Sequence, residues 1–374
     1  MRSVRDSATA SFRLVSVRDN YVCPSPTLPL DDGGNHSRTS DGRVRTLRSL
    51  SKNESKMVGE PIFDLYSAYW GSLSYADDFV MGALNASGPF AGATPSQRIE
   101  YIQKGTAYQN VWMAVLHELH VATAGCGASD SISDGARVHA WDKAWAFYAG
   151  SLTKTAGYPD SGQLVYELAN KRCQNYATCE KVGRGNAAVN EAILVQFEAG
   201  RDALAAGTCS EAVALFPSIV SHMTLPLVQG TMRYAYLADA KGGEGADIEI
   251  AEGWAFAAAV LPLVDRCNST TANFIYSNMW IGLLQPVPDG HEAVVKAFQS
   301  VYDCLGITCS GVGGLVGAYA NDETDAVRSY HFDPCYDAPS KAPTVPLLES
   351  GSRSVMALLA GSLLVPLLTA VVVV

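Results

Sequence analysis

The sequence carries few charged residues and lacks the short motifs of the common enzyme classes. Only 17% of its 374 residues are charged and 48% are hydrophobic, which argues against a disordered chain. No phosphate-binding loop, no GxSxG nucleophile elbow and no HExxH zinc motif occurs. Alternating patterns that predict strands are also scarce. These absences leave a helical protein whose chemistry has to come from scattered histidines and carboxylates.

The net charge of −10 is unevenly distributed. Residues 1–56 hold ten Lys or Arg and six Asp or Glu, a net +4, so the remainder carries −14 by difference. An acidic body argues against nucleic acid as a partner and is compatible with binding a cation. The simpler explanation of the acidity is solubility.

The two ends of the chain give conflicting indications of targeting. Residues 1–56 contain no apolar run of signal-peptide length, so this segment is predicted to be disordered or a mispredicted start. Residues 355–374 are apolar and uncharged, and they follow a linker with small residues at 341–354. This arrangement resembles a GPI-attachment signal, with a tail-anchoring transmembrane helix as the alternative. We therefore expect attachment to a membrane through the C-terminus.

Cysteine is not scarce, although no CxxC pair occurs. Eight of the nine cysteines lie in the body, at positions 126, 173, 179, 209, 267, 304, 309 and 335. An even set without CxxC favours disulfides over a zinc site, and disulfides indicate secretion. Cys173 with Cys179, and Cys304 with Cys309, are close enough for local loops, but the sequence leaves the connectivity open. The disulfide candidates are Cys126, Cys173, Cys179, Cys209, Cys267, Cys304, Cys309 and Cys335.

Sequons for N-glycosylation agree with a secreted protein. They occur at Asn35, Asn53, Asn85 and Asn268, and the last two lie in the body. Asn85 and Asn268 are therefore the glycosylation candidates.

A buried amphipathic helix is predicted for residues 134–150. Asp134 can cap its start, because its carboxylate can accept from free amides of the first turn. An apolar stripe recurs at helical spacing, formed by Val138, Trp141, Trp145 and Tyr148. His139 and Asp142 share a neighbouring face. In a mostly buried helix these polar groups need partners, which are protein, water or a metal.

A second segment, residues 246–262, repeats the pattern of this helix. The matched positions are Trp145-Ala146-Phe147 with Trp254-Ala255-Phe256, and Gln103-Lys104-Gly105-Thr106 with Val228-Gln229-Gly230-Thr231, followed by Tyr108 and Tyr234. Two copies in the same order predict an internal duplication, at about 95–210 and 215–310. The expected fold is an all-α, internally duplicated helical body with disulfides, spanning residues 57–340.

Another helix is predicted to start at Thr94, which precedes Pro95 and stands three residues before Gln97. It could run to Gly125, with Gly105 as a break.

The candidate metal ligands are polar residues that share helix faces. His139 and Asp142 are the leading pair, and the others are His117, His120, Glu249, Glu252 and Tyr148. Carboxylate, phenolate and imidazole groups together suit a hard cation such as ferric iron. A cleft between duplicated halves could gather them. For each pair the alternative is a hydrogen-bonded core group or a solvated helix face.

Three segments carry a resemblance to a known family. WDKAWAFYAGSL, YELANKRCQNYATC and NAAVNEAILVQFEAGRDAL resemble the low-iron-inducible periplasmic proteins of algae, to which the phytotransferrins of marine algae are similar. The resemblance covers roughly residues 60–335. It implies a cell-surface or periplasmic protein, membrane-anchored in some members, that helps to capture ferric iron. It does not identify the metal ligands in this sequence.

The sequence therefore predicts a non-enzymatic ferric iron-binding protein for iron uptake, on the outer face of the plasma membrane or in the periplasmic space. Carbonate could be a co-ligand, and an iron permease or reductase is the expected protein partner. One alternative is an extracellular metal-dependent hydrolase of the metallopeptidase type, although no HExxH supports it. The other is a structural cell-surface glycoprotein without a ligand.

Overall fold

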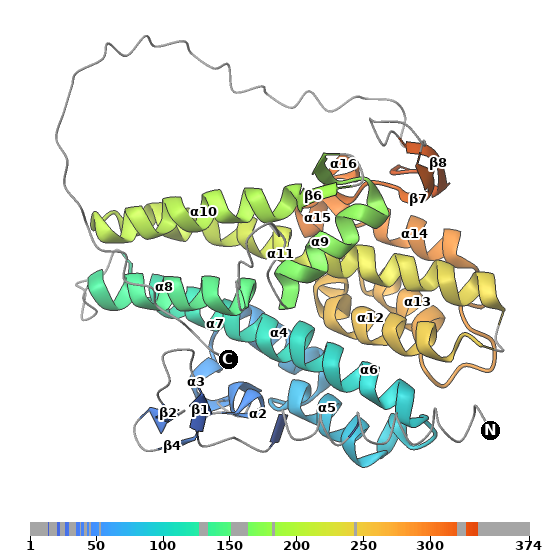
Figure 1. Cartoon of the computed structure of the whole chain (residues 1–374), viewed down its shortest axis with the longest axis horizontal. Helices are drawn as coiled ribbons and strands as arrows, with labels where there is room; N and C mark the ends of the chain where they lie inside the picture. The colour runs from blue at the N-terminus through green and yellow to red at the C-terminus, as the bar shows by residue number, and fades with distance from the viewer. Residues whose placement is uncertain are drawn as a thin grey trace, which may run out of the picture.

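The computed structural model describes residues 54–126, 134–150, 164–181, 184–242, 245–319 and 327–335, with short pieces between residues 14 and 51 (Figure 1). The predictions for the linker at 341–354 and the tail at 355–374 lie outside the described residues, as does much of segment 1–56.

Helices form the body, as the sequence predicts. The N-terminal half contains α2 (Leu47–Ser51), α3 (Glu54–Met57), α4 (Pro61–Trp70), α5 (Tyr75–Asn85), η1 (Gly88–Phe90), α6 (Pro95–Gly105), η2 (Thr106–Val111), α7 (Trp112–Thr123), α8 (Asp134–Ala149) and α9 (Leu164–Tyr176). The C-terminal half contains α10 (Ala188–Ala205), α11 (Cys209–Lys241), α12 (Asp247–Cys267), α13 (Ser269–Met279), α14 (His291–Gln299), α15 (Tyr302–Leu305) and α16 (Cys309–Val312).

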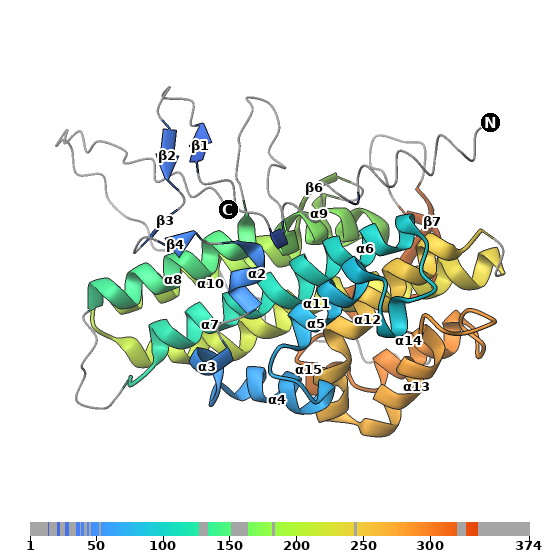
Figure 2. The ribbon, with the colours of Figure 1, turned by 90° about the horizontal axis from the view of Figure 1, so that it is seen from below.

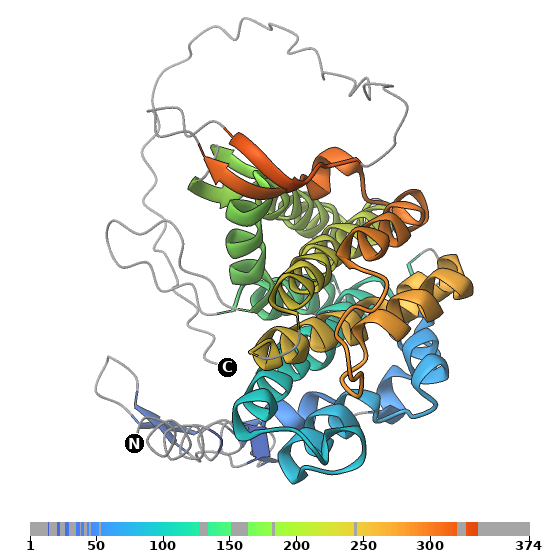
Figure 3. The same cartoon turned by 90° about the vertical axis from the view of Figure 1, so that its right-hand side faces the viewer.

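Strands in the described part of the chain occur as short antiparallel pairs. The pairs are β1 (Thr27–Pro29) with β2 (Asn35–Ser37), β3 (Thr39–Ser40) with β4 (Arg43–Val44), β5 (Cys179–Lys181) with β6 (Arg184–Ala187), and β7 (Leu315–Tyr319) with β8 (Val327–Phe332). The last two pairs lie near α9, at one side of the helices (Figure 3).

Helices α11 and α12 form the centre of the body. From Ala251 to Val264, α12 is buried at every position except Glu252, which is partly exposed. Its alanines let neighbouring helices approach closely, and it packs against α4, α6, α11 and α13. Figure 3 shows this centre between the blue and cyan N-terminal helices and the green and orange elements. The core therefore encloses almost all of α12, and Glu252 is the exception.

Helix α11 is long and apolar enough to span a membrane by length and composition alone. Half of its most apolar window is buried inside the molecule. Pro217 and Pro226 lie inside it, and each removes one intrahelical amide donor. Its burial against α10 and α12 explains the apolar composition.

The predicted start at Thr94 is confirmed as a capping box. The Gln97 amide donates to Thr94 Oγ1 at 3.3 Å, and the Thr94 amide donates to Gln97 Oε1 at 2.8 Å. The sequence predicts a break at Gly105, but the chain stays helical there. The chain instead widens into the π-helical turn η2 and continues as α7. A side chain at Gly105 would collide with the Phe79 ring, since its Cβ would lie 2.6 Å from Phe79 Cδ1.

The apolar stripe of α8 packs as predicted, but its polar face does not. Trp141 and Tyr148 are fully buried, and Trp141 Nε1 donates to the Phe197 carbonyl of α10 at 2.8 Å. His139 and Asp142 are exposed to solvent. The expectation that tight packing surrounds these two side chains is therefore wrong. The helix has a solvated face after all, because α7, α9 and α10 cover only its other sides.

Four disulfides pair all eight body cysteines, which confirms the prediction of a disulfide-bonded body. The bridges are Cys126–Cys209, Cys173–Cys179, Cys267–Cys304 and Cys309–Cys335. The local Cys173–Cys179 loop is as expected, whereas a local loop between Cys304 and Cys309 is wrong. Cys304 on α15 pairs with the end of α12, and Cys309 at the start of α16 pairs beyond β8.

Part of segment 1–56 packs onto the body. The Tyr21 hydroxyl donates to Asp77 Oδ1 at 3.0 Å, and Arg48 Nε donates to the same oxygen at 2.8 Å.

The sequons at Asn85 and Asn268 are on the surface, and Asn268 Oδ1 caps α13 by accepting from the Thr271 amide at 3.1 Å. Both asparagines are accessible for glycosylation, which stays a prediction.

The internal duplication also stays a prediction. The matched Trp-Ala-Phe segments fall on α8 and α12, which are both helical as the match requires. The segments around Gly105 and Gly230 lie on α6 and in the middle of α11, so their local settings differ.

The close approach of α8 to α10 gives a stability prediction. A Cβ at Gly200 would lie 2.0 Å from Trp141 Cζ2, and the buried indole has no room to move away. We expect Gly200→Ala to lower the free energy of unfolding by about 1–3 kcal/mol. Denaturant unfolding followed by circular dichroism measures this change.

The matched control is Gly135→Ala on α8, where a Cβ would meet no atom within 4 Å. Alanine is a better helix former than glycine, so this variant should be neutral or more stable, by up to about 1 kcal/mol. Equal unfolding midpoints for the two variants would contradict the packing described between α8 and α10.

Candidate functional site

The predicted metal ligands do not come together. Among the described residues no group of three or more His, Cys, Asp and Glu could hold a metal ion. His139 and Asp142 lie on the exposed face of α8. Partial burial raises the pKa of Asp142, while Arg201 and His139 lower it. This pair is accessible but has no third ligand.

Three of the remaining predicted residues, His117, Glu249 and Tyr148, have partners within the protein. His117 Nδ1 pairs with Glu60 Oε1 at 2.5 Å, and Lys241 Nζ pairs with Glu249 Oε1 at 2.5 Å. The buried Tyr148 hydroxyl donates to Asn190 Oδ1 at 2.5 Å, so it serves packing between α8 and α10. His120 is half-buried and lines an apolar cavity.

Glu252 alone among the predicted residues belongs to a larger polar group. Its Oε2 lies 3.3 Å from Lys104 Nζ, and Glu252 is close enough to the Tyr234 hydroxyl to raise the pKa of that phenol. Tyr108 and Arg172 are close enough to interact electrostatically with Tyr234. We call these five residues, Lys104, Tyr108, Arg172, Tyr234 and Glu252, the tyrosine–arginine cluster.

The cluster is built around the Phe256 ring. Tyr108 and Tyr234 both stack on it, with ring centroids 5.1 and 5.7 Å away and interplanar angles of 21° and 12°. Phe256 is fixed in turn by Gly230, where a Cβ would lie only 2.8 Å from its ring. The π-helical turn η2 carries Tyr108, and an extra residue per turn is a frequent feature of functional sites. Packing therefore holds both phenols on the same aromatic ring.

Arg172 on α9 is buried without enough hydrogen-bond acceptors. It is 7% exposed, and its Nε and Nη1 have no hydrogen-bond partner among the residues that the structure describes. Its guanidinium carbon lies 5.7 Å from the centroid of the Tyr234 ring, where it makes a cation–π contact. Buried donors without an acceptor are costly, so this guanidinium is suited to holding an anion.

The phenols of the cluster are protonated at neutral pH. Burial raises the pKa of Tyr108, and the charges of Glu167 and Glu252 raise it further, while Arg172 lowers it. Burial also raises the pKa of Tyr234, as do the charge and hydrogen bond of Glu252. A metal that binds these oxygens must therefore displace protons.

Solvent reaches the cluster through a cavity of about 280 Å³. Lys104 and Tyr108 line it, together with Glu167 and Lys171, which form an ion pair at 2.5 Å. The cavity lies between α6 and α9 and borders the cluster at Lys104 and Tyr108. Lys104 also pairs with Glu100 at 2.5 Å, so it keeps a partner if a cation replaces it at Glu252.

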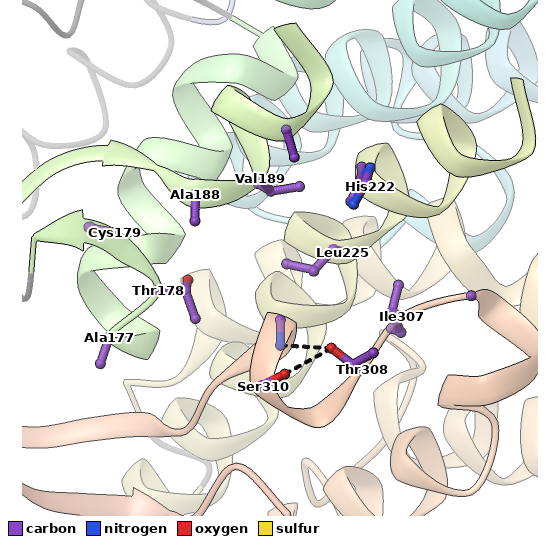
Figure 4. Close-up of a pocket in the computed structure, with 13 residues that line it drawn as sticks. Ala177, Thr178, Cys179, Ala188, Val189, His222, Leu225, Ile307, Thr308 and Ser310 are labelled. Carbon is purple, nitrogen blue, oxygen red and sulfur yellow. Dashed lines mark hydrogen bonds between the residues drawn. The ribbon is translucent and has the colours of Figure 1, made fainter. Parts of the chain in front are cut away.

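A second cavity, of about 330 Å³, lies among β5, α10, α11 and α16 and is shown in Figure 4. Most of its lining side chains are small or apolar, and its one ionisable group is His222. Burial lowers the pKa of His222, so the imidazole is neutral at pH 7. This cavity offers no charge to a ligand, and the tyrosine–arginine cluster is the better candidate site.

Sequence reasoning noticed most of these residues without assigning them to one site. Tyr108 and Tyr234 occupy matched positions of the two predicted copies, and Arg172 lies in a segment that carries the family resemblance. The match between the two copies could have identified the two tyrosines as related positions. The contact of Glu252 with Tyr234 depends on how α11 packs against α12, and this packing cannot be predicted from spacing in the sequence.

These features define an exported, disulfide-bonded helical protein with a buried cluster of phenol, carboxylate and guanidinium groups. The family model described as "low iron-inducible periplasmic protein" matches residues 30–328, and the chain belongs to this family. Neither the curated proteins nor the solved structures contain a significant match.

Proposed function

We propose that the protein captures ferric iron for uptake by binding it at the tyrosine–arginine cluster. The observation that carries the proposal is the arrangement of Tyr108 and Tyr234 around Phe256, next to Glu252 and the unsatisfied donors of Arg172. Family membership connects the chain to a periplasmic response to low iron. Within that role, the cluster is the group of described residues whose chemistry best suits a hard trivalent cation.

In this proposal the metal takes phenolate oxygens from Tyr108 and Tyr234 and a carboxylate oxygen from Glu252. Lys104 gives up its contact with Glu252, since two cations would repel each other at this distance, and it keeps its pair with Glu100. Arg172 holds an anion that completes the coordination. Carbonate fits this role because its oxygens match the planar fork of a guanidinium.

The description of the family model refers to low iron and to the periplasm, which supports a role in iron uptake without a catalysed reaction. Captured iron then has to pass to a membrane partner, and an iron permease or reductase is the proposed recipient. A metal-dependent hydrolase is less well supported, because no group of three His, Cys, Asp or Glu ligands forms among the described residues.

The ligand assignment predicts which variants lose iron. Tyr234→Phe and Tyr108→Phe each remove one phenolate, so each should weaken ferric binding by at least about 100-fold, because even residues behind a ligand cost 10–100-fold. The visible absorption band that arises from charge transfer between phenolate and iron should also lose most of its intensity in each variant. Competition with a ferric chelator, followed by absorbance in carbonate buffer, measures both effects.

Matched controls separate the cluster from the earlier candidates. Tyr330→Phe changes a phenol that is 37% exposed on β8, and His139→Ala changes the exposed face of α8. Both should bind iron as the unchanged protein does. Loss of binding in His139→Ala, with binding intact in Tyr234→Phe, would move the site to α8 and refute the proposal.

The raised phenol pKa values predict a steep pH dependence. Both phenols are protonated at neutral pH, so binding of the metal releases protons. As the pH is lowered, the apparent affinity for iron should therefore fall by about tenfold per pH unit for each proton displaced. Tyr234→Phe should release one proton fewer than the unchanged protein. Titration with ferric chelate in weak buffer counts the protons, and an unchanged count would exclude Tyr234 as a ligand.

We also propose that the protein is held at the membrane by its C-terminal segment, through a GPI link. The proposal rests on the uncharged apolar sequence of residues 355–374. Phosphatidylinositol-specific phospholipase should then release the protein from intact cells into the supernatant, as judged by immunoblot. Retention, when a known GPI-linked protein is released from the same cells, would indicate a spanning helix.

A further inference from the structure

A further cavity lies away from the tyrosine–arginine cluster. It is open to solvent, has a volume of about 660 Å³ and is lined by residues of α4, α7, α11, α12 and α15. Figure 2 shows α4 and α15 side by side at the lower edge of the molecule, next to α12. Pockets for small organic ligands have volumes of about 300–1,000 Å³, so the cavity is large enough for such a ligand.

The walls of this cavity are mainly apolar. They include Phe63, Met113, Leu116, Val220 and Leu263, all of which are buried. At its edge the apolar surface extends to Val213, which is 41% exposed. An open apolar surface of this kind costs free energy in water, and an apolar ligand would remove that cost.

Most polar groups on the walls are already committed to other partners. Glu60 pairs with His117, and the hydroxyls of Thr123, Ser221 and Thr224 each donate to a backbone carbonyl of their own helix. Their hydrogen-bonding capacity is used inside the protein. These groups therefore have no hydrogen bond left to offer a ligand, and the walls present a mainly apolar surface.

Two basic side chains differ from the other polar groups. His120 on α7 and Arg266 at the end of α12 line the cavity, and neither side chain has a hydrogen-bond or ion-pair partner within the described part of the chain. Arg266 is exposed and is followed by Cys267, whose bridge to Cys304 joins α12 to α15. The bridge fixes the wall that carries the guanidinium, so the cavity exists before any ligand arrives.

From these observations we infer that this cavity binds a long-chain monocarboxylate. The alkyl chain lies against the apolar walls, and the carboxylate is held at the edge by Arg266 with support from His120. A guanidinium binds a carboxylate through two parallel hydrogen bonds, which a neutral or cationic head group cannot accept. This site is separate from the proposed iron site and does not depend on iron.

The inference is tested by calorimetric titration of the full chain with dodecanoate below its micelle concentration. We expect saturable binding of dodecanoate and at least tenfold weaker binding of the dodecyltrimethylammonium cation, which has the same chain with the opposite charge. Comparable affinity for the two amphiphiles, or no saturable binding of dodecanoate, would overturn the inference.

Two variants test the location without disturbing the core. Arg266→Gln should weaken dodecanoate binding by about tenfold, since it removes a charge-assisted contact. Val213→Glu places a carboxylate at the exposed edge and should weaken binding by a similar factor. The matched controls are Arg201→Gln and Val195→Glu, both at exposed positions of α10 outside the cavity.

Both controls should bind dodecanoate as the unchanged protein does. If the edge variants and the controls lose affinity equally, the ligand binds nonspecifically and the inference fails. If neither edge variant changes the affinity, dodecanoate binds elsewhere and the inference also fails. Iron binding in Arg266→Gln should be unchanged, so this experiment fails or succeeds independently of the proposed iron site.

Discussion

The contact between Gly230 of α11 and the Phe256 ring of α12 is the constraint on which the site depends. A single Cβ at Gly230 would lie 2.8 Å from the ring, so glycine is required for the two central helices to pack this closely. Because the ring cannot move, the two tyrosines that stack on it are also fixed. If the proposed function is right, side chains fixed in this way lose little conformational entropy on binding the metal.

The charged groups of the cluster are only partly balanced by one another. Glu252 is the one partly exposed position between Ala251 and Val264 of α12. The positions around it are buried, and such a helix normally carries apolar residues there. The charge of Glu252 is balanced by Lys104, while the buried Arg172 lacks acceptors for two of its nitrogens. Such incompletely satisfied polar groups reduce stability, and proteins tolerate them chiefly where function requires them.

Much of the fold could be predicted from the sequence because its signals are local. The Thr94 capping box, the apolar stripe of α8 and the even set of body cysteines each depend on neighbouring residues or on composition. The site was harder to predict. The pattern of α8 predicts a mostly buried helix in which His139 and Asp142 need partners, yet its neighbours leave the face with these two side chains in water. Periodicity identifies the apolar face of a helix but not how many neighbours cover the other faces.

The sequence by itself determined that this protein is helical, disulfide-bonded and related to a family induced by low iron, since these properties reside in composition, spacing and motif. Only the tertiary structure decided that Tyr108 and Tyr234 stack on one phenylalanine, and that Arg172 from α9 reaches the same place. It also decided that Cys304 and Cys309, five positions apart, join different partners. The physical reason is that these contacts link residues far apart in the chain, and close packing of whole helices, not local preference, selects them.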